Sequence, residues 1–284
     1  MSAQSNAVAL VTGATRGIGR GTALALAEHG YIVYITGRTR QAGGHTLSGS
    51  LEETRAEVEA RGGRCVAVAV DHADDAQIEA LFEQIRADEG RLDLLVNNVM
   101  AIPEAMTAGG PFWEKSLDVW AMMDVGLRSN FVAARLAAQL MVGQGGGLIV
   151  AMSGYVGVTY TYDVVFGTCK AATDRMARDM AVELKPHGVC SVSLWQGFTF
   201  TERALKNLET VQGMRAQLNS AAGSSAEFPG RVIRALAEDP DRMAYSGASL
   251  IVPELAQSYG LKDIDGREIP SLRESRGAPI WQPV

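Results

Sequence analysis

The chain has 284 residues, of which 47% are hydrophobic and 20% are charged, and its formal net charge is −6. This length and composition are typical of one large α/β domain, or of two small ones, with a sizeable buried core. The negative net charge disfavours binding to nucleic acid or to an anionic membrane surface.

Neither the N-terminus nor any later stretch predicts a targeting or membrane segment. Residues 1–6 are polar and are not followed by a long apolar run, so we expect no signal peptide. A run of about 18 uncharged apolar residues is missing from the sequence, which predicts no transmembrane helix. The three cysteines, Cys65, Cys169 and Cys190, are widely spaced and lack metal-ligand spacing. They predict reduced thiols in a cytoplasmic protein and no metal site.

Short apolar runs rich in β-branched residues alternate with longer helix-compatible segments along most of the chain. Strands are predicted at residues 7–12, 31–36, 65–70, 92–97, 148–153, 189–195 and 248–252. Helices are predicted at residues 18–29, 51–61, 74–88, 117–142, 168–185 and 228–238. Runs that are apolar on both faces suit strands buried in a parallel sheet. The alternation therefore predicts a single α/β domain, a doubly wound, seven-stranded parallel sheet of the Rossmann type.

Three segments interrupt this alternation. Residues 39–50 are glycine-rich and polar and predict a long loop after the second strand. Residues 199–225 are mixed and largely polar, which favours a substrate loop or lid. Residues 260–284 are rich in charge and proline and predict an irregular C-terminal tail. None of the three has the pattern of a second folded domain.

A glycine turn joins the first predicted strand to the first predicted helix, where residues 8–19 read VALVTGATRGIG. Gly13 permits a tight turn, Gly17 lets the backbone approach a pyrophosphate, and Gly19 allows close helix–strand packing. The helix that begins near Ile18 presents free amides and its positive dipole end to phosphate oxygens. The motif therefore predicts a dinucleotide-binding site.

This glycine motif resembles the cofactor signature of the short-chain dehydrogenase/reductase family. The resemblance continues over most of the chain, through Asp71, Asn97-Asn98, Ser153, Lys170, Trp195-Gln196-Gly197 and Thr201. Residues 33–38, 187–189, 193–195 and 259–267 resemble one particular subgroup of that family. The resemblance implies an oxidoreductase that transfers a hydride between a nicotinamide cofactor and a small carbonyl compound or alcohol.

The end of the second strand bears on the choice of cofactor. An acidic residue there would hydrogen-bond a ribose 2′-hydroxyl and repel a 2′-phosphate. This strand instead ends in Thr36-Gly37-Arg38, and the guanidinium groups of Arg38 and Arg16 could each pair with a phosphate. Both positions match those that favour NADP in the family, so NADP(H) is the expected cofactor. The alternative is two solvated surface arginines.

Further cofactor contacts are implied by the resemblance. Asp71 matches the residue that contacts the adenine, Asn97 the one that steadies the sheet beside the cofactor, and Thr201 the one that binds the carboxamide. Lys170 matches the lysine that holds the nicotinamide ribose. The expected cofactor-binding residues are therefore Gly13, Thr15, Arg16, Gly17, Ile18, Gly19, Arg38, Asp71, Asn97, Lys170, Gly197 and Thr201.

The expected chemical site departs from the family at one position. In the family a serine polarises the carbonyl and a tyrosine delivers the proton, while a lysine four residues later lowers the pKa of the tyrosine. Ser153 and Lys170 fit the serine and lysine positions, but Phe166 stands in the tyrosine position. General acid–base catalysis is worth about 10²–10⁴-fold, which sets the expected loss.

Three explanations for Phe166 stay open. The protein is an enzyme in which another group delivers the proton, with Tyr162 as the candidate if the helix extends back to it, and with Tyr155 and Tyr160 on the preceding loop. It is an engineered Tyr-to-Phe variant. Or it binds NADP without oxidoreductase activity, as a sensor or scaffold. The relay asparagine of the family is also replaced, by Gly126, and Val99-Met100 replaces the usual alanine-glycine.

The loops expected to line a substrate pocket carry large apolar side chains: Met100, Ile102, Met106, Phe112, Trp113, Tyr155, Trp195, Phe198 and Phe200. They predict an apolar or bulky substrate, unless many of them are core residues. The predicted helices at residues 117–142 and 168–185 form the dimer interface in the family. The resemblance therefore implies a homodimer or homotetramer, with no nucleic-acid partner and no membrane span.

Overall fold

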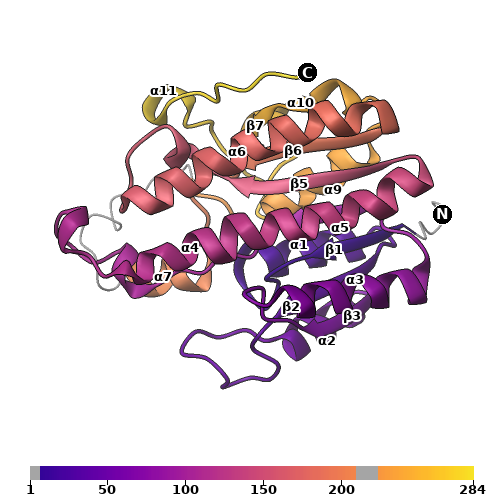
Figure 1. Ribbon diagram of the computed structural model, residues 1–284, viewed down its shortest axis with the longest axis horizontal. Helices are drawn as coiled ribbons and strands as arrows, with labels where there is room; N and C mark the ends of the chain where they lie inside the picture. The colour runs from indigo at the N-terminus through magenta and orange to yellow at the C-terminus, as the bar shows by residue number, and fades with distance from the viewer. Residues whose placement is uncertain (1–6, 209–222) are drawn as a thin grey trace.

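The computed structural model describes residues 7–208 and 223–284. Seven parallel strands form one sheet in the order β3-β2-β1-β4-β5-β6-β7 (Figure 1). The strands are β1 Val8–Val11, β2 Ile32–Gly37, β3 Arg64–Ala69, β4 Leu94–Asn97, β5 Gly147–Ser153, β6 Val189–Trp195 and β7 Ser249–Ile251. The strand order reverses between β1 and β4, the switch point at which such sheets bind ligands. The predicted doubly wound, seven-stranded sheet in a single domain is confirmed.

Helices cover both faces of the sheet. The longer ones are α1 Gly17–Ala27, α2 Leu51–Ala60, α3 Asp75–Glu89, α5 Ser129–Gln144, α6 Val164–Leu184 and α9 Phe228–Glu238. The short ones are α4 Ala121–Met123, α7 Glu202–Leu208, α10 Val252–Ser258 and α11 Arg273–Arg276. α5 and α6 cross in front of the sheet in Figure 1, whereas α1 and α9 lie behind it. Within the two described ranges, no helix has the length and apolar character that crossing a membrane requires.

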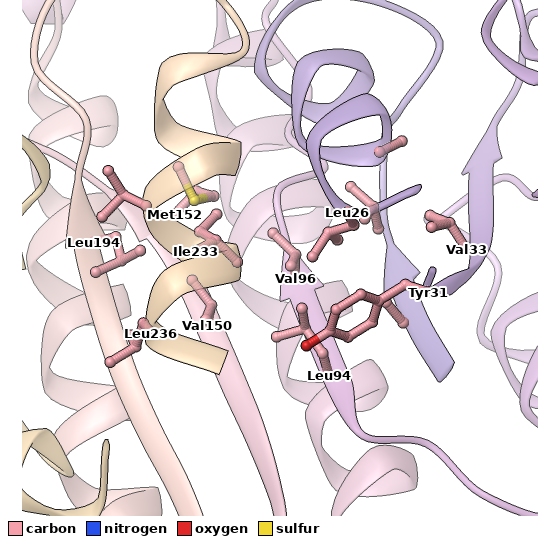
Figure 2. Close-up of a cluster of buried hydrophobic side chains, with 14 of the residues drawn as sticks. Leu26, Tyr31, Val33, Leu94, Val96, Val150, Met152, Leu194, Ile233 and Leu236 are labelled. Atoms are coloured by element: carbon pink, nitrogen blue, oxygen red, sulfur yellow. The ribbon is translucent and has the colours of Figure 1, made fainter. Parts of the chain in front are cut away.

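The two faces of the sheet carry separate apolar clusters because successive side chains of a strand point to opposite faces. Along β5, Val150 and Met152 face α1 and α9, while Ile149 faces α3 and α5. Figure 2 shows Ile233 of α9 in the first cluster. Each fully buried side chain of this size contributes about 1.5–3 kcal/mol to folding. Apolar packing therefore stabilises the sheet on both faces, and loops surround the carboxyl ends of its strands.

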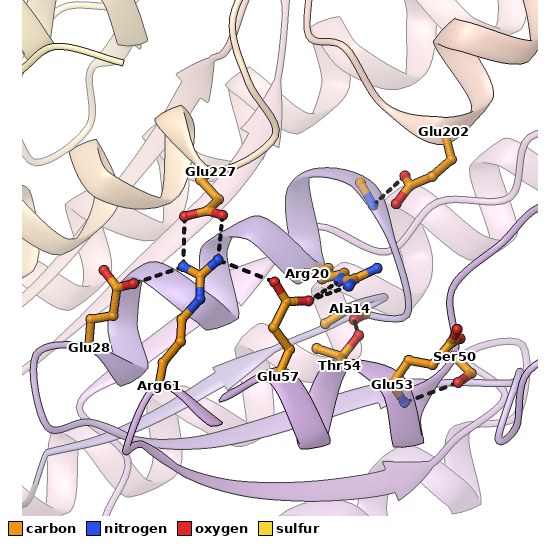
Figure 3. Close-up of polar contacts among 11 residues, drawn as sticks. Ala14, Arg20, Glu28, Ser50, Glu53, Thr54, Glu57, Arg61, Glu202 and Glu227 are labelled. Atoms are coloured by element: carbon orange, nitrogen blue, oxygen red, sulfur yellow. Dashed lines mark hydrogen bonds and ion pairs between the residues drawn. The ribbon is translucent and has the colours of Figure 1, made fainter. Parts of the chain in front are cut away.

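Polar side chains fix the starts of the helices and tie neighbouring helices together. Ser50 caps α2 by accepting a hydrogen bond from the Glu53 amide at 3.2 Å (Figure 3). At the other end of α2, Arg61 donates two hydrogen bonds to Glu227, at 3.0 and 2.9 Å, and so holds α2 to the start of α9. These contacts fix the helices that flank the glycine loop.

The predicted continuous helix over residues 117–142 is wrong in its first half. A 3₁₀ turn, Leu117–Trp120, and the short α4 precede a kink at which Gly126 has φ 155°, a conformation that L side chains rarely adopt. The carbonyls freed by the kink find other donors: Val125 O accepts from the Ala101 amide at 2.6 Å, and Gly126 O accepts from Asn130 Nδ2 at 2.6 Å. A regular helix, α5, begins only at Ser129.

The helix predicted at residues 168–185 begins earlier, at Val164, because Asp163 caps it. Asp163 Oδ1 accepts from the amides of Val165 and Phe166 at 2.7 and 3.4 Å. The buried Asp163 carboxylate also lies 3.0 Å from Lys115 Nζ. Phe166 therefore lies in the first turn of α6. Tyr162 precedes the helix, with φ 66°, so α6 does not extend back to it.

The three irregular segments differ from one another in structure. Residues 39–50 form the predicted loop without helix or strand. The predicted substrate loop contains α7, and its residues 209–222 lie outside the described residues. The C-terminal segment contains α11 and then follows the edge strand β7, where Trp281 O accepts from the Ser249 amide at 3.2 Å.

Candidate functional site

The glycine loop between β1 and α1 is held at the switch point by the end of β4. Asn98 Nδ2 donates to the carbonyls of Thr12 and Gly13 at 2.8 and 3.1 Å. The amides of Asn98 and Val99 both donate to Thr12 Oγ1 at 3.0 Å. Asn98 and Val99 thus form an ordered turn, and its hydrogen bonds to Thr12 and Gly13 hold the glycine loop in place.

Two glycines of the loop sit where a side chain would not fit. Gly13 has φ 67°, and a Cβ there would lie 2.9 Å from Val99 Cα. A Cβ at Gly19 would lie 2.4 Å from the Gly13 carbonyl oxygen. These contacts agree with the tight turn and the close helix packing predicted from the motif. Thr15 is buried beside this turn, against Gly37 of β2, and Ile18 packs at the margin of the α1 core.

The Gly17 amide at the start of α1 already holds an anion. It donates to Glu202 Oε2 at 2.8 Å (Figure 3). Gly17 has φ 56°, and the first turn of α1 contains no acidic residue. The side chain of Glu202 therefore stands in for a phosphate oxygen at the amide that the motif assigns to a pyrophosphate. On this observation the loop fits a dinucleotide.

Arg16 and Arg38, the two arginines expected to pair with the 2′-phosphate of NADP, have different surroundings. The guanidinium group of Arg16 donates to the carbonyls of Ser48 and Gly49, each at 2.8 Å, and so anchors the 39–50 loop. Arg38 is 74% exposed at the end of β2, and its Nη1 lies 3.9 Å from Asp71 Oδ2. The structure thus brings Arg38 and Asp71 together, and it shows Arg16 engaged with backbone.

A buried histidine that sequence reasoning missed supports the glycine loop from the β2 side. His72 Nε2 lies 2.7 Å from Thr36 Oγ1, which in turn accepts from the Gly13 amide at 3.3 Å. Burial lowers the pKa of His72 to about 4, so the ring is neutral at physiological pH. The sequence carries no signal that would separate this histidine from an exposed one.

Asn97 links the switch point to the kink before α5. Its Nδ2 donates to the Asn130 carbonyl at 2.9 Å, and Asn130 Nδ2 donates to Gly126 O. Among the described residues, Asn97 Oδ1 has no hydrogen-bond partner although it is buried. Asn97 therefore connects the end of β4 to the kink at Gly126 through Asn130.

Ser153 and Lys170 come together at the carboxyl end of β5. The Ser153 hydroxyl donates to the Lys170 carbonyl at 3.2 Å, and Lys170 Nζ donates to the Met152 carbonyl at 2.7 Å. Ser153 is fully buried and Lys170 is 8% exposed. Burial lowers the pKa of Lys170, because the charged ammonium loses its hydration. The predicted serine–lysine pair therefore exists, with both polar groups held by backbone carbonyls.

Asp174 is a buried carboxyl group beside this pair that sequence reasoning also missed. Both of its oxygens lie 3.1 Å from Trp195 Nε1, which donates to them. Burial raises the pKa of Asp174, and the hydrogen bond from Trp195 Nε1 opposes that rise. Its position four residues after Lys170, on the same helix face, was the available signal.

Phe166 has an apolar environment. It packs against a cluster that contains Met106, Val119 and Met122, and Met100 joins the same cluster. The Tyr162 ring is centred 6.4 Å from the Phe166 ring, and the Tyr162 carbonyl accepts from Lys115 Nζ at 2.9 Å. The Tyr162 ring thus lies near the tyrosine position, which Phe166 itself occupies, and Tyr162 is 37% exposed. Burial raises the pKa of Tyr162, which makes it a weaker acid.

Several of the side chains expected to line a substrate pocket are instead core residues. Tyr155 and Trp195 are buried against each other, with ring centroids 5.2 Å apart, and the Tyr155 hydroxyl accepts from the Leu272 amide at 3.1 Å. Phe112 and Trp113 are 63% and 72% exposed. The apolar groups near Phe166 are those of the methionine cluster.

Gly197 and Thr201 lie on the segment that leads from β6 into α7. Gly197 has φ 75°. Thr201 Oγ1 accepts from the Ala204 amide at 3.2 Å, which caps α7. A Cβ at Gly17 would lie 3.2 Å from Thr201 Cγ2, so Thr201 borders the glycine loop. The β6 end and the glycine loop therefore meet across the switch point.

Comparison with known proteins adds independent information. A family model described as short chain dehydrogenase matches residues 7–212. The chain is 41% identical over 274 residues to dehydrogenase/reductase SDR family member 1 of Mus musculus, covering 92% of this chain and 84% of that protein. It is 40% identical over 272 residues to the Homo sapiens protein of the same name, with the same coverage. This is the subgroup that the particular stretches resemble, and the resemblance is confirmed.

Solved structures agree on the fold. Acetoin dehydrogenase from Enterobacter cloacae superposes with a TM-score of 0.71 at 28% identity, over 88% of this chain and 94% of its own. YwfH, an NADPH-dependent reductase involved in bacilysin biosynthesis, superposes with a TM-score of 0.73 at 23% identity, over 87% of this chain and 96% of its own. At that identity the second likeness concerns the fold alone.

Proposed function

The chain belongs to the short-chain dehydrogenase/reductase family, and on that premise we propose that it transfers a hydride between NADP(H) and an apolar carbonyl compound or alcohol. The observation that carries the proposal is the Ser153–Lys170 pair at the end of β5, set beside a glycine loop whose Gly17 amide holds an anion. The family binds nicotinamide cofactors, and the bound cofactor would supply or accept the hydride.

The preference for NADP(H) rests on the end of β2. Arg38 exposes its guanidinium group there, next to Asp71, and no acidic side chain follows β2 directly to repel a 2′-phosphate. A planar guanidinium group can bind phosphate through two hydrogen bonds. Arg16, held by the carbonyls of the 39–50 loop, contributes a second positive charge to the expected phosphate site.

The chain's own residues would handle the substrate oxygen and its proton. Lys170 Nζ lies 2.7 Å from the carbonyl oxygen of Met152, the residue before Ser153, in a buried setting where a charge acts more strongly on its neighbours than it would in water. To donate a hydrogen bond to a substrate oxygen, the Ser153 hydroxyl must first break its hydrogen bond to the Lys170 carbonyl. Phe166 has no proton to give, and we assign that role to Tyr162, whose ring contacts the Phe166 ring. The expected turnover is slow.

The substrate class follows from the side chains around Phe166. The partly buried members of the methionine cluster, among them Met100, Val165 and Phe166, form an apolar surface, and a flexible side chain such as Met100 adapts to irregular ligands. An apolar or bulky carbonyl compound suits this surface better than a sugar or a carboxylate.

One arrangement favours a second function, an NADP-binding protein without turnover that acts as a sensor or scaffold. Ser153 and Lys170 are both buried and satisfied by backbone carbonyls, and the tyrosine position is apolar. Under this alternative the dinucleotide binds, but no proton donor is brought to a substrate.

The proposed oligomeric state and the proposed cytoplasmic location rest on two separate features of the molecule. A hollow of about 640 Å³ on the outer face of α5 and α6 is lined by Phe131, Met176 and Met180 among others. Two copies joined through this face would cover it, as expected for a homodimer or homotetramer. The three free cysteines fit a reducing, cytoplasmic environment.

The cofactor assignment is tested by titrating the protein with NADPH and with NADH and following fluorescence. We expect NADPH to bind more tightly, and Arg38→Ala to lower NADPH affinity by about tenfold while leaving NADH affinity unchanged. Arg40→Ala, an exposed arginine on the same loop, is the matched control. A Kd for NADH equal to or below that for NADPH would refute the assignment.

A further inference from the structure

Glu202 is the first residue of α7, and it connects the segment after β6 to the glycine loop. Its carboxylate accepts the Gly17 N–H at 2.8 Å across the switch point, a contact between residues far apart in sequence (Figure 3). The neighbouring Thr201 packs its methyl group toward Gly17. α7 is therefore attached to the loop by one charged hydrogen bond and one apolar contact.

The atoms of this contact are those that a pyrophosphate would use. An amide at the N-terminus of an α-helix carries partial positive charge, and anions bind there by the same donor geometry. A carboxylate and a phosphate cannot occupy one amide together, because both are acceptors and both are negative. Binding of a dinucleotide in the family manner therefore requires the Glu202 carboxylate to leave.

The surrounding charges also suit a phosphate. Burial lowers the pKa of Arg16, and the field of Glu202 opposes that shift, so the two side chains are electrostatically coupled. Burial likewise lowers the pKa of Arg203, the next residue of α7, and Glu104 opposes that shift. Glu202 thus neutralises part of a cationic environment that would otherwise attract the cofactor.

We propose that Glu202 is an internal competitor for the cofactor pyrophosphate, so that cofactor binding exchanges a carboxylate for a phosphate at Gly17 and displaces the start of α7. This inference rests on the proposed function, because it assumes that a dinucleotide binds at the glycine loop. It adds a residue that weakens cofactor affinity and links the cofactor site to the segment following β6. The exchange breaks one hydrogen bond to Gly17 and forms another, with no covalent step.

The experiment compares Kd values at low ionic strength for the full chain and three variants. Glu202→Gln removes the charge and keeps the shape, whereas Glu202→Asp keeps the charge on a side chain too short to hold the contact. Glu79→Gln, at an exposed position on α3, makes the same charge change elsewhere. The ligands are NADPH, which carries a pyrophosphate, and adenosine 2′-monophosphate, which does not.

We expect Glu202→Gln to bind NADPH about three- to tenfold more tightly than the parent, a change of the size expected for the net contribution of one hydrogen bond. Glu202→Asp should show a smaller gain, Glu79→Gln none, and adenosine 2′-monophosphate should bind all four proteins equally. An equal gain for both ligands, equal NADPH affinity in all four proteins, or weaker NADPH binding by Glu202→Gln would overturn the inference. Failure of every protein to bind NADPH or NADH would overturn the proposed function as well.

A second readout follows α7 itself. Amide hydrogen exchange of residues 202–207 in the parent should rise when NADPH is added, since the Gly17 contact is broken. Ligand-free Glu202→Gln should already show the faster exchange. Unchanged exchange in both comparisons would contradict the proposed displacement even if affinities differed.

Discussion

The buried Asp174 carboxylate lies beside the Ser153–Lys170 pair and accepts from Trp195 Nε1, which lies 3.1 Å from both carboxylate oxygens. Removing only the acceptor of a buried hydrogen bond leaves the donor unsatisfied, which costs more free energy than removing the donor and the acceptor together. The free energy of the Asp174–Trp195 contact should therefore appear as a difference between the stability lost in the double variant and the sum of the losses in the two single variants.

Asp174→Ala should lower the free energy of unfolding by about 2–3 kcal/mol, because it strands the Trp195 N–H and opens a small void. Adding Trp195→Phe should cost less in that background than in the parent. The measurement is urea unfolding of the parent, both single variants and the double variant. Strictly additive losses would show that the two side chains do not interact.

His72 predicts a pH dependence of stability. The pKa of His72 is about 4 in the folded chain, against an unperturbed value of 6.5. Between those pH values the unfolded chain binds a proton that the folded chain does not, so stability falls as the pH falls from about 6.5 toward 4. The full effect is about 3 kcal/mol.

His72→Gln keeps a donor for Thr36 but does not titrate, so its unfolding free energy should fall less than that of the parent between about pH 7.5 and 4.5. Urea unfolding at both pH values measures this difference. His187→Gln, which changes an exposed histidine, should behave like the parent. Identical pH dependence for the parent and His72→Gln would contradict the buried, neutral state.

Sequence reasoning at the residue level succeeded where a motif fixes a backbone shape and failed where a contact joins distant segments. Gly13 and Gly19 are required by close approaches within one turn, which the motif encodes locally. Glu202 reaches Gly17 only through the path that the chain takes after β6, and His72 reaches Thr36 only through the pairing of β2 with β3. Neither contact has a local sequence signature.

At the scale of elements, the strands were predictable, whereas the kink before α5 and the early start of α6 were not. The apolar pattern over residues 117–142 is continuous, and the single glycine within it is tolerated by helices. What breaks the helix is tertiary: the Ala101 amide and the Asn130 side chain take the carbonyls of Val125 and Gly126. The kink lies at Gly126, the position that the family resemblance assigns to a relay asparagine.

Gly126→Ala should destabilise the protein by about 1–3 kcal/mol, because φ is 155° and the new Cβ would lie 3.1 Å from Met100 Cγ. Gly143→Ala, on the regular part of α5 with open space around it, should instead stabilise by about 0.5–1 kcal/mol. Thermal unfolding of the two variants compares the same substitution in opposite settings. A neutral Gly126→Ala would refute the strained kink.

At the scale of the whole molecule, the outer face of α5 and α6 is the surface we assign to self-association. Phe131 is 50% exposed on it, beside the hollow lined by Met176 and Met180. An exposed apolar surface of this kind marks an interaction site. The family resemblance pointed to these two helices, but the hollow between them had no sequence signal.

Light scattering at micromolar concentration should give a dimer or tetramer for the parent and a smaller species for Phe131→Glu, since burying a carboxylate without a partner is unfavourable. Ile264→Glu, a similarly exposed apolar position outside this face, is the control. A monomeric parent, or an unchanged mass for Phe131→Glu, would contradict the assigned interface.

The central proposal is that this chain transfers hydride although Phe166 stands at the position that the family resemblance gives to the proton donor. It is tested most directly by incubating the protein with NADPH deuterated at C4 and a panel of apolar carbonyl compounds, then measuring deuterium in the alcohol product. We predict labelled product from the parent and faster labelling, by about 10²–10⁴-fold, from Phe166→Tyr. Tight NADPH binding with no labelled product from either protein would contradict the claim and favour the sensor or scaffold.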